Sequence, residues 1–154
     1  MRGNAIAFGN RKLSPVFAAV YDMSTSTSSS DKKVGTALSN NRSEKDCDAA
    51  VFSYSSGELT CKKAGRYRIQ YFAGGDYNSA GYKTVVYSFY KNQTAIVPET
   101  SYSGSDSTGN YVDMGEITVD LLPGDILYML FRSGSSPTGI YFRAGYIITP
   151  YSGD

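Results

Sequence analysis

The stretch Gly57–Gly75, GELTCKKAGRYRIQYFAGG, decides the fold class. A turn glycine leads into a short strand that ends at Cys61, and a second strand follows two lysines, an alanine and Gly65. In this second strand one face carries Tyr67, Ile69, Tyr71 and Ala73, and the other face carries Arg66, Arg68 and Gln70. Alternation with a period of two is typical of a β-strand with one buried face. The stretch therefore predicts a hairpin in a β-protein.

The rest of the chain repeats this pattern, with short apolar runs separated by Gly- and Ser-rich turns. The sequence predicts further strands at residues 15–21, 34–38, 49–54, 83–90, 115–121, 126–131 and 141–149. It predicts polar loops at residues 24–33, 40–46, 99–110 and 133–139, and a tight turn at LPGD, where Pro123 and Gly124 set the two corners. No segment shows a helical period with caps. Eight or more strands of this kind predict a sandwich or jelly roll.

A length of 154 residues suits one domain. We expect residues 1–13 to be a lead-in and residues 14–151 to form the domain. No apolar run approaches the roughly 20 residues that a membrane helix needs, so membrane insertion is not expected.

Composition removes several function classes. The net charge is +1 and the basic residues are scattered, so nothing indicates a nucleic-acid partner. The chain has no histidine, which excludes Ser-His-Asp and Cys-His catalysis within it, as well as zinc sites that contain histidine. It has 14 tyrosines and no tryptophan, and tyrosine favours half-buried strands and wet interfaces. Cys47 and Cys61 match no redox motif, and a disulfide and two thiols both remain open.

Carboxylate pairs offer the only route to an enzyme, and their spacing argues against it. Glu116 and Asp120 are four residues apart on one predicted strand, which separates them by about 13 Å. That distance is too long for either geometry of a glycoside hydrolase. We therefore do not expect an enzyme.

The order of the motifs resembles the globular head domains of the C1q/tumour-necrosis-factor superfamily. The segments VFSYSSGELTCKKAGRYRIQYFAG, YSFYKNQ, GEITVDLLPGDILYMLF and YFRAGYIIT follow one another as the corresponding family segments do. The matching positions are Gly57, Thr60, Cys61, Gly65, Tyr67, Lys91, Asn92, Leu121, Gly124, Asp125, Phe142 and Gly145. Ala64 stands where the family often has proline, and no collagen-like tract precedes the domain. The chain thus resembles a distant member, of a phage or bacterial kind.

The resemblance implies a ten-stranded jelly roll that assembles as a homotrimer. The run ILYMLF, residues 126–131, agrees with this, because it is apolar on both faces and only one can fill the core. The alternative is that both faces lie inside one subunit. For the trimer interface we expect Tyr128, Leu130, Tyr146 and Ile148.

The resemblance also implies recognition through loops rather than chemistry. Loops that mix tyrosine, serine, asparagine and glycine suit adaptable contacts with a glycan or a protein receptor. The ligand-binding residues expected on this basis are Tyr77, Asn78, Tyr82, Tyr102, Asp106, Asn110 and Tyr111. Some family heads hold calcium, which Asp76, Asp106 and Asp113 could ligate, but no DxDxDG spacing supports a dedicated site, so neither a metal nor a cofactor is predicted.

The function predicted from the sequence is that of a head domain on a phage tail fibre or another virion or extracellular surface protein. Its partners would be two copies of itself and a cell-surface glycan or receptor. The alternative is a purely structural trimerisation or capping module that binds no ligand.

Overall fold

The computed structural model describes residues 14–24, 31–34, 42–77, 83–104, 109–133 and 141–151. These residues form eleven strands and no helix: β1 (Phe17–Ser24), β2 (Lys32–Lys33), β3 (Arg42–Cys47), β4 (Phe52–Ser55), β5 (Glu58–Cys61), β6 (Gly65–Tyr77), β7 (Lys83–Lys91), β8 (Thr94–Gly104), β9 (Gly109–Leu121), β10 (Ile126–Ser133) and β11 (Tyr141–Pro150). Accordingly, no helix in these ranges is long and apolar enough to cross a membrane.

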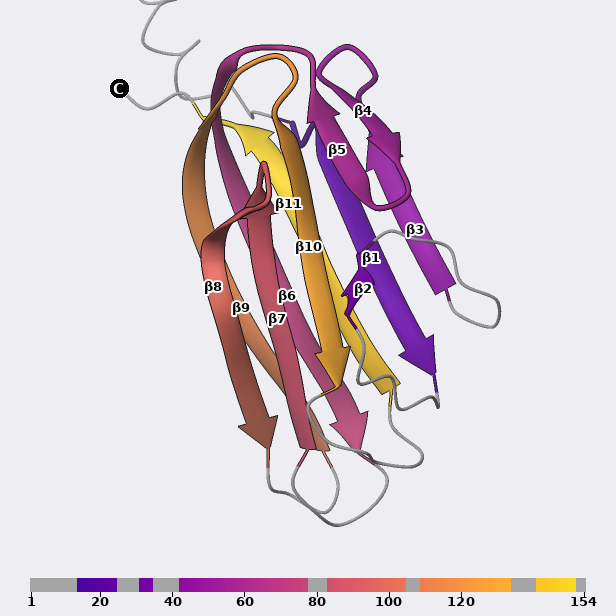
Figure 1. The fold of residues 1–154 in the computed structure, drawn as a ribbon. Helices are drawn as coiled ribbons and strands as arrows, with labels where there is room; N and C mark the ends of the chain where they lie inside the picture. Colours follow the sequence, from indigo (N-terminus) through magenta and orange to yellow (C-terminus); the bar gives the residue numbers. More distant parts are fainter. Residues whose placement is uncertain are drawn as a thin grey trace, which may run out of the picture.

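Two antiparallel sheets face each other in a sandwich (Figure 1). Sheet 1 has the strand order β3-β1-β11-β6-β9, and sheet 2 has the order β4-β5-β10-β7-β8, with the two-residue β2 added beside β10. From β5 onward the chain crosses between the sheets at most connections, which is the arrangement of a jelly roll. The predicted all-β, ten-stranded jelly-roll sandwich is confirmed, with β2 as a small eleventh strand.

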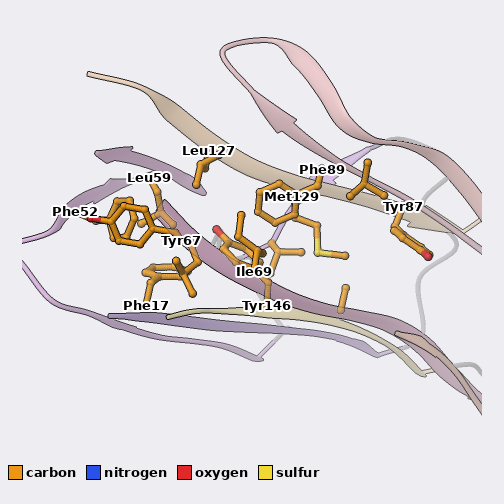
Figure 2. Packing of buried hydrophobic residues seen from close by; sticks show 14 of the residues in the cluster. Phe17, Phe52, Leu59, Tyr67, Ile69, Tyr87, Phe89, Leu127, Met129 and Tyr146 are labelled. Carbon is orange, nitrogen blue, oxygen red and sulfur yellow. The ribbon is translucent and has the colours of Figure 1, made fainter. Parts of the chain in front are cut away.

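The core lies between the sheets and is built from the alternate residues of each strand. Figure 2 shows sheet 1 contributing Phe17, Tyr67, Ile69 and Tyr146, against Leu59, Phe89, Leu127 and Met129 from sheet 2. Aromatic rings join the layers: the rings of Phe89 and Tyr146 meet edge to face with centroids 5.0 Å apart. The predicted inward face of the GRYRIQYFA strand is therefore confirmed, because Tyr67, Ile69 and Ala73 are all buried. The hairpin predicted for residues 57–75 is wrong, because β5 belongs to sheet 2 and β6 to sheet 1.

Two predicted loops are wrong, because strands occupy most of them. The polar segment at residues 40–46 contains β3, a strand at the edge of sheet 1, where charged residues are tolerated and no apolar alternation is needed. The segment at residues 99–110 is largely strand as well, since β8 runs to Gly104 and β9 begins at Gly109. Of the strand predicted at residues 34–38, only Val34 is described, and it follows the short strand β2; residues 35–38 lie outside the described ranges, so the rest stays a prediction.

The predicted turns are confirmed and have defined geometry. Ser56 and Gly57 both have positive φ, 50° and 82°, as the two-residue turn between β4 and β5 requires. At LPGD, Gly124 has φ 94° and the Asp125 amide donates to the Leu122 carbonyl at 3.0 Å. Cys47 and Cys61 are free thiols, and the Cys61 thiol donates to the Lys63 carbonyl at 3.2 Å.

Candidate functional site

An open pocket of about 530 Å³ lies on the outer face of sheet 2. Its walls come from β5, from the turn between β7 and β8, and from β10; the lining residues are Glu58, Asn92, Gln93, Ile126 and Tyr128. Its volume falls within the range of about 300–1,000 Å³ that is usual for small-molecule sites. All of its lining residues lie in the described ranges, so we built the candidate site around it.

The turn that forms one wall is held in an unusual backbone conformation. Asn92 and Gln93 connect β7 to β8, and Lys91 pairs with Thr94 across the hairpin. Both turn residues have positive φ, 49° for Asn92 and 68° for Gln93. Two-residue hairpins of this type favour Asn at the first position and Gly at the second. Asn92 therefore fits its position, whereas Gln93 holds a conformation that costs about 1–2 kcal/mol in a residue with a Cβ.

Hydrogen bonds fix this turn to the start of β10. The backbone amide of Asn92 donates to the Ile126 carbonyl at 2.9 Å, and the backbone amide of Ile126 donates to Asn92 Oδ1 at 2.8 Å. Asn92 Nδ2 donates to Asp125 Oδ1 at 2.6 Å, and Lys91 Nζ lies 3.1 Å from Asp125 Oδ2. The pocket floor is thus a rigid junction between two turns.

Asp125 is the centre of this junction. Its Oδ2 accepts the Leu122 amide at 2.9 Å, and its carbonyl accepts the Cys61 amide at 2.8 Å. The Leu122 amide, then Asn92 and then Lys91 lower the pKa of the Asp125 carboxyl, because all of them stabilise its ionised form. Cys61, Lys91, Asn92, Gly124 and Asp125 come from segments far apart in the sequence, and the junction brings them together at one end of the sandwich.

Tyr128 supplies the aromatic wall. It alternates with the buried Leu127 and Met129 on β10, so its ring points outward and is half-buried. The ring stacks on Tyr90 with centroids 5.1 Å apart and planes 6° from parallel. Lys33 Nζ lies 5.0 Å from the Tyr128 ring centroid and forms an ion pair with Glu58. Contacts on both sides therefore fix the orientation of the Tyr128 ring.

The outer face of sheet 1 carries a different feature, an apolar stripe. Val112 is 51% exposed, Met114 is 76% exposed and Ile147 is 40% exposed. The half-buried Phe72 lies directly between Met114 on β9 and Gly145 on β11, so the stripe crosses three strands. Water-exposed apolar groups gathered in this way usually mark an interaction surface. The stripe and the pocket lie on opposite outer faces of the sandwich.

The residues predicted to bind a ligand fall at the far end of the strands or outside the described ranges. Asn78, Tyr82 and Asp106 lie outside them. Backbone register places Tyr77 opposite Gly109, Asn110 opposite Asp76, and Tyr111 opposite Gly75, so these three gather at one end of the β6–β9 pair in sheet 1. Tyr102 pairs with Val85 in sheet 2. A role for these seven residues in ligand binding stays a prediction.

The four residues predicted at a trimer interface divide into two pairs. Tyr146 and Ile148 are 0% exposed within the single chain, because both point into the core between the sheets. This part of the prediction needs correction: the outward face of β11 carries Ile147, one residue away. Tyr128 and Leu130 lie on the outer face of sheet 2, where both are half-buried. The predicted split of ILYMLF into two faces is therefore correct for this strand.

The carboxylates considered for calcium do not form a cluster in the described part of the chain. Asp113 accepts a short hydrogen bond from the Tyr87 hydroxyl, and burial together with this carboxylate raises the pKa of Tyr87. Asp106 lies outside the described ranges. Within them no three acidic or cysteine side chains gather as a metal site would require.

Sequence reasoning missed the pocket residues Glu58, Gln93 and Ile126, and it assigned Asn92 only to a turn. These side chains come from segments far apart in the chain, so no local spacing unites them. A single local signal was available, since the pair Asn92-Gln93 occupies a two-residue turn in which the second position favours glycine.

Two solved structures are among those that resemble this chain. The globular domain of zebrafish complement 1qA protein aligns with 86% of this chain and 95% of its own, at 20% identity and a TM-score of 0.49. Rabbit GITRL aligns with 86% of this chain and 93% of its own, at 14% identity and a TM-score of 0.43. No family model matches the chain, and no curated protein matches it either. Identities this low carry nothing about function, which must be argued from the two surfaces described above.

Proposed function

We propose that this domain is the homotrimeric head of a larger virion or surface assembly and that it recognises a ligand on a cell surface. The observation that carries the proposal is the apolar stripe on sheet 1, formed by Phe72, Val112, Met114 and Ile147. Leaving such a stripe in water is costly, since burying apolar surface gains roughly 25 cal/mol per Å². Further copies of the same chain are the occupant we propose, in agreement with the trimer that the sequence resemblance implies.

The neighbours of the stripe support this assignment. Ile147 pairs with Gln70, which pairs in turn with Glu116, and the next row along the sheet holds Thr149, Arg68 and Thr118. The apolar area is thus bounded by polar residues on one side, as the core and rim of a subunit interface are.

Ligand recognition is supported by the position of the pocket. Subunits that pack through sheet 1 leave sheet 2 facing outward, so that three pockets stay open to solvent. Three identical sites on one rigid body increase the apparent affinity for a surface with repeated ligands. A phage tail fibre or another virion or extracellular surface protein is the parent assembly that suits such a head.

A structural role without a ligand is the second candidate, and the same stripe favours it. A trimer that serves only to nucleate or cap a fibre requires an apolar interface but no binding pocket. The two functions therefore share the oligomeric state and differ in whether the pocket binds.

The test of assembly is the solution mass by light scattering on a size-exclusion column. We expect a particle of three times the 16.7 kDa chain mass. Met114→Glu places a charge in the stripe and should yield monomers that retain their β-sheet circular dichroism. Thr118→Glu is the matched control, because Thr118 is exposed on the same face of β9 and pairs with Arg68. A monomeric wild-type chain, or a Met114→Glu variant that remains trimeric, contradicts the proposal.

A further inference from the structure

We infer that the pocket on sheet 2 is a binding site for a neutral saccharide, with the exposed edge of the Tyr128 ring as its apolar wall and Gln93 as the principal polar contact. The inference rests on the proposed function, since it names a site and a ligand class for the recognition assumed there. It differs from the loop residues predicted from the sequence, which lie elsewhere on the molecule.

Gln93 gives the first line of argument. It has φ 68° at a turn position where glycine would relieve the strain, yet its side chain lines the pocket. Its carboxamide has no hydrogen-bond partner among the described residues. Strained backbone that is held by its surroundings tends to lie at functional sites. A free amide group presents both a donor and an acceptor, which is what a pair of neighbouring hydroxyl groups requires.

Tyr128 gives the second line. Tyr90 and Lys33 hold its ring in place, so little conformational entropy remains to be lost when a ligand covers the exposed part. Because Tyr90 and Lys33 occupy the two sides of the ring, its edge is what remains exposed to a ligand. The C–H groups of a sugar ring can pack against this edge while its hydroxyl groups reach polar neighbours. The Tyr128 hydroxyl also lacks a partner among the described residues and lies free for such a contact.

Charge around the pocket selects against ionic ligands. The Glu58 carboxylate is paired with Lys33, and the Asp125 carboxylate is paired with Lys91. Each of these charged side chains thus has an opposite charge beside it, and the net charge around the pocket is close to zero. A neutral ligand has no charge to desolvate when it enters the pocket. A cation or an anion would lose its hydration and would find no unpaired opposite charge there to compensate.

The shape of the site agrees with a sugar as well. The pocket opens widely to solvent and mixes a tyrosine ring and an isoleucine with a carboxylate and two carboxamides. Deep apolar cavities suit lipids and cofactors, but an open, mixed site suits a polar ring that is bound on one side only.

The experiment is saturation-transfer NMR on the full chain. The probes are the methyl glycosides of glucose, galactose, mannose and N-acetylglucosamine, with N-acetylneuraminic acid and argininamide as charged comparisons. We expect transfer to at least one neutral glycoside and none to the charged probes. Tyr128→Ala should weaken the binding by roughly tenfold or more, because the apolar wall of the pocket and the Tyr128 hydroxyl are lost. Tyr151→Ala is the matched control: this tyrosine is 43% exposed and lies outside the pocket, so binding should be unchanged.

Gln93→Gly keeps the inference testable if Tyr128→Ala fails to fold. The glycine relieves the strained turn, so the variant should melt at a higher temperature than the wild type and yet bind the glycoside several-fold more weakly. A residue with a purely structural role cannot produce this opposite pair of changes.

The remaining outcomes all count against the saccharide site. Wild-type chain that binds no neutral glycoside, or only argininamide or N-acetylneuraminic acid, overturns it. Binding that survives both Tyr128→Ala and Gln93→Gly places the sugar elsewhere and overturns it too. None of these results touches the trimer, which the solution mass decides separately, so the two proposals can fail independently.

Discussion

Asn92 and Asp125, 33 residues apart in the chain, are joined by a hydrogen bond of 2.6 Å between Nδ2 and Oδ1. This contact ties the β7–β8 turn to the β9–β10 turn, and Asn92 adds a pair of hydrogen bonds with Ile126. Asn92 is therefore a structural anchor as well as a wall of the pocket.

Two substitutions of Asn92 should separate the stabilisation that its side-chain contacts give from the stabilisation that comes from its tolerance of a positive φ. Asn92→Gly loses the side-chain contacts but tolerates the positive φ, so we expect the free energy of unfolding to fall by about 1 kcal/mol. Asn92→Ala loses the contacts and also strains the turn, for a fall of about 2–3 kcal/mol. Urea denaturation at neutral pH measures both. Equal values for the two variants would show that the turn conformation costs nothing.

The Asp125 carboxyl should make the free energy of unfolding depend on pH. Its pKa is lowered in the folded chain, chiefly by the Leu122 amide and then by Asn92 and Lys91. A lowered folded pKa means that the stabilisation is complete above the unfolded value of about 3.9 and is lost as the pH falls through the folded value. The urea midpoint should therefore drop below about pH 4. Asp125→Asn should be less stable than wild type at pH 7 and should lose less of its stability in acid; an unchanged pH profile contradicts the assignment.

Tyr146 presents an unpaired hydroxyl to the core. Its side chain is 0% exposed, and its hydroxyl has no hydrogen-bond partner in the described structure. We expect Tyr146→Phe to raise the free energy of unfolding by about 1 kcal/mol, because a desolvated hydroxyl is removed. Tyr67→Phe is the matched control, since the Tyr67 hydroxyl donates to the Lys63 carbonyl at 2.6 Å and its loss should destabilise. Thermal melting that orders the two variants the other way would refute this account.

Gly115 leaves room for the Tyr71 ring. A Cβ at Gly115 would lie 2.2 Å from the Tyr71 hydroxyl oxygen and 2.3 Å from Cζ. Gly115→Ala should therefore lower the free energy of unfolding by about 1–3 kcal/mol. In a Tyr71→Ala background the same change meets an empty space and should cost much less. The double-mutant cycle by urea denaturation tests this, and additive effects would show that the two residues do not collide.

Alternation along the strands predicted much of the fold. Residues 66–73 alternate because one face of the strand is buried, and the apolar residues of segments 83–90 and 126–131 predict strands as well; all three are strands in the structure. The turns at Gly57 and Gly124 were predicted from turn chemistry, and both glycines have the positive φ that favours glycine. Periodicity and turn chemistry thus determine the sandwich locally.

The errors have equally physical causes. An edge strand such as β3 needs no apolar face, and the parts of β8 and β9 that fall within residues 99–110 are polar, so neither predicted loop alternates. On β11 both Tyr146 and Ile147 are apolar, and composition alone does not say which one faces the core. The pocket escaped prediction because its walls meet only after the strands have paired, with Glu58 and Tyr128 coming from segments about 70 residues apart.

The position of the last two strands has a consequence for how the chain folds during synthesis. β10 occupies the middle of sheet 2, and β11 occupies the middle of sheet 1. A chain emerging from the ribosome can form the hairpins β4–β5 and β7–β8 at once, but neither sheet can join its two halves until those strands appear. Until then, long strand edges on β1, β5, β6 and β7 have no neighbour to pair with. Nascent chains stalled before Ile126 should therefore aggregate, whereas release of the whole chain completes both sheets together.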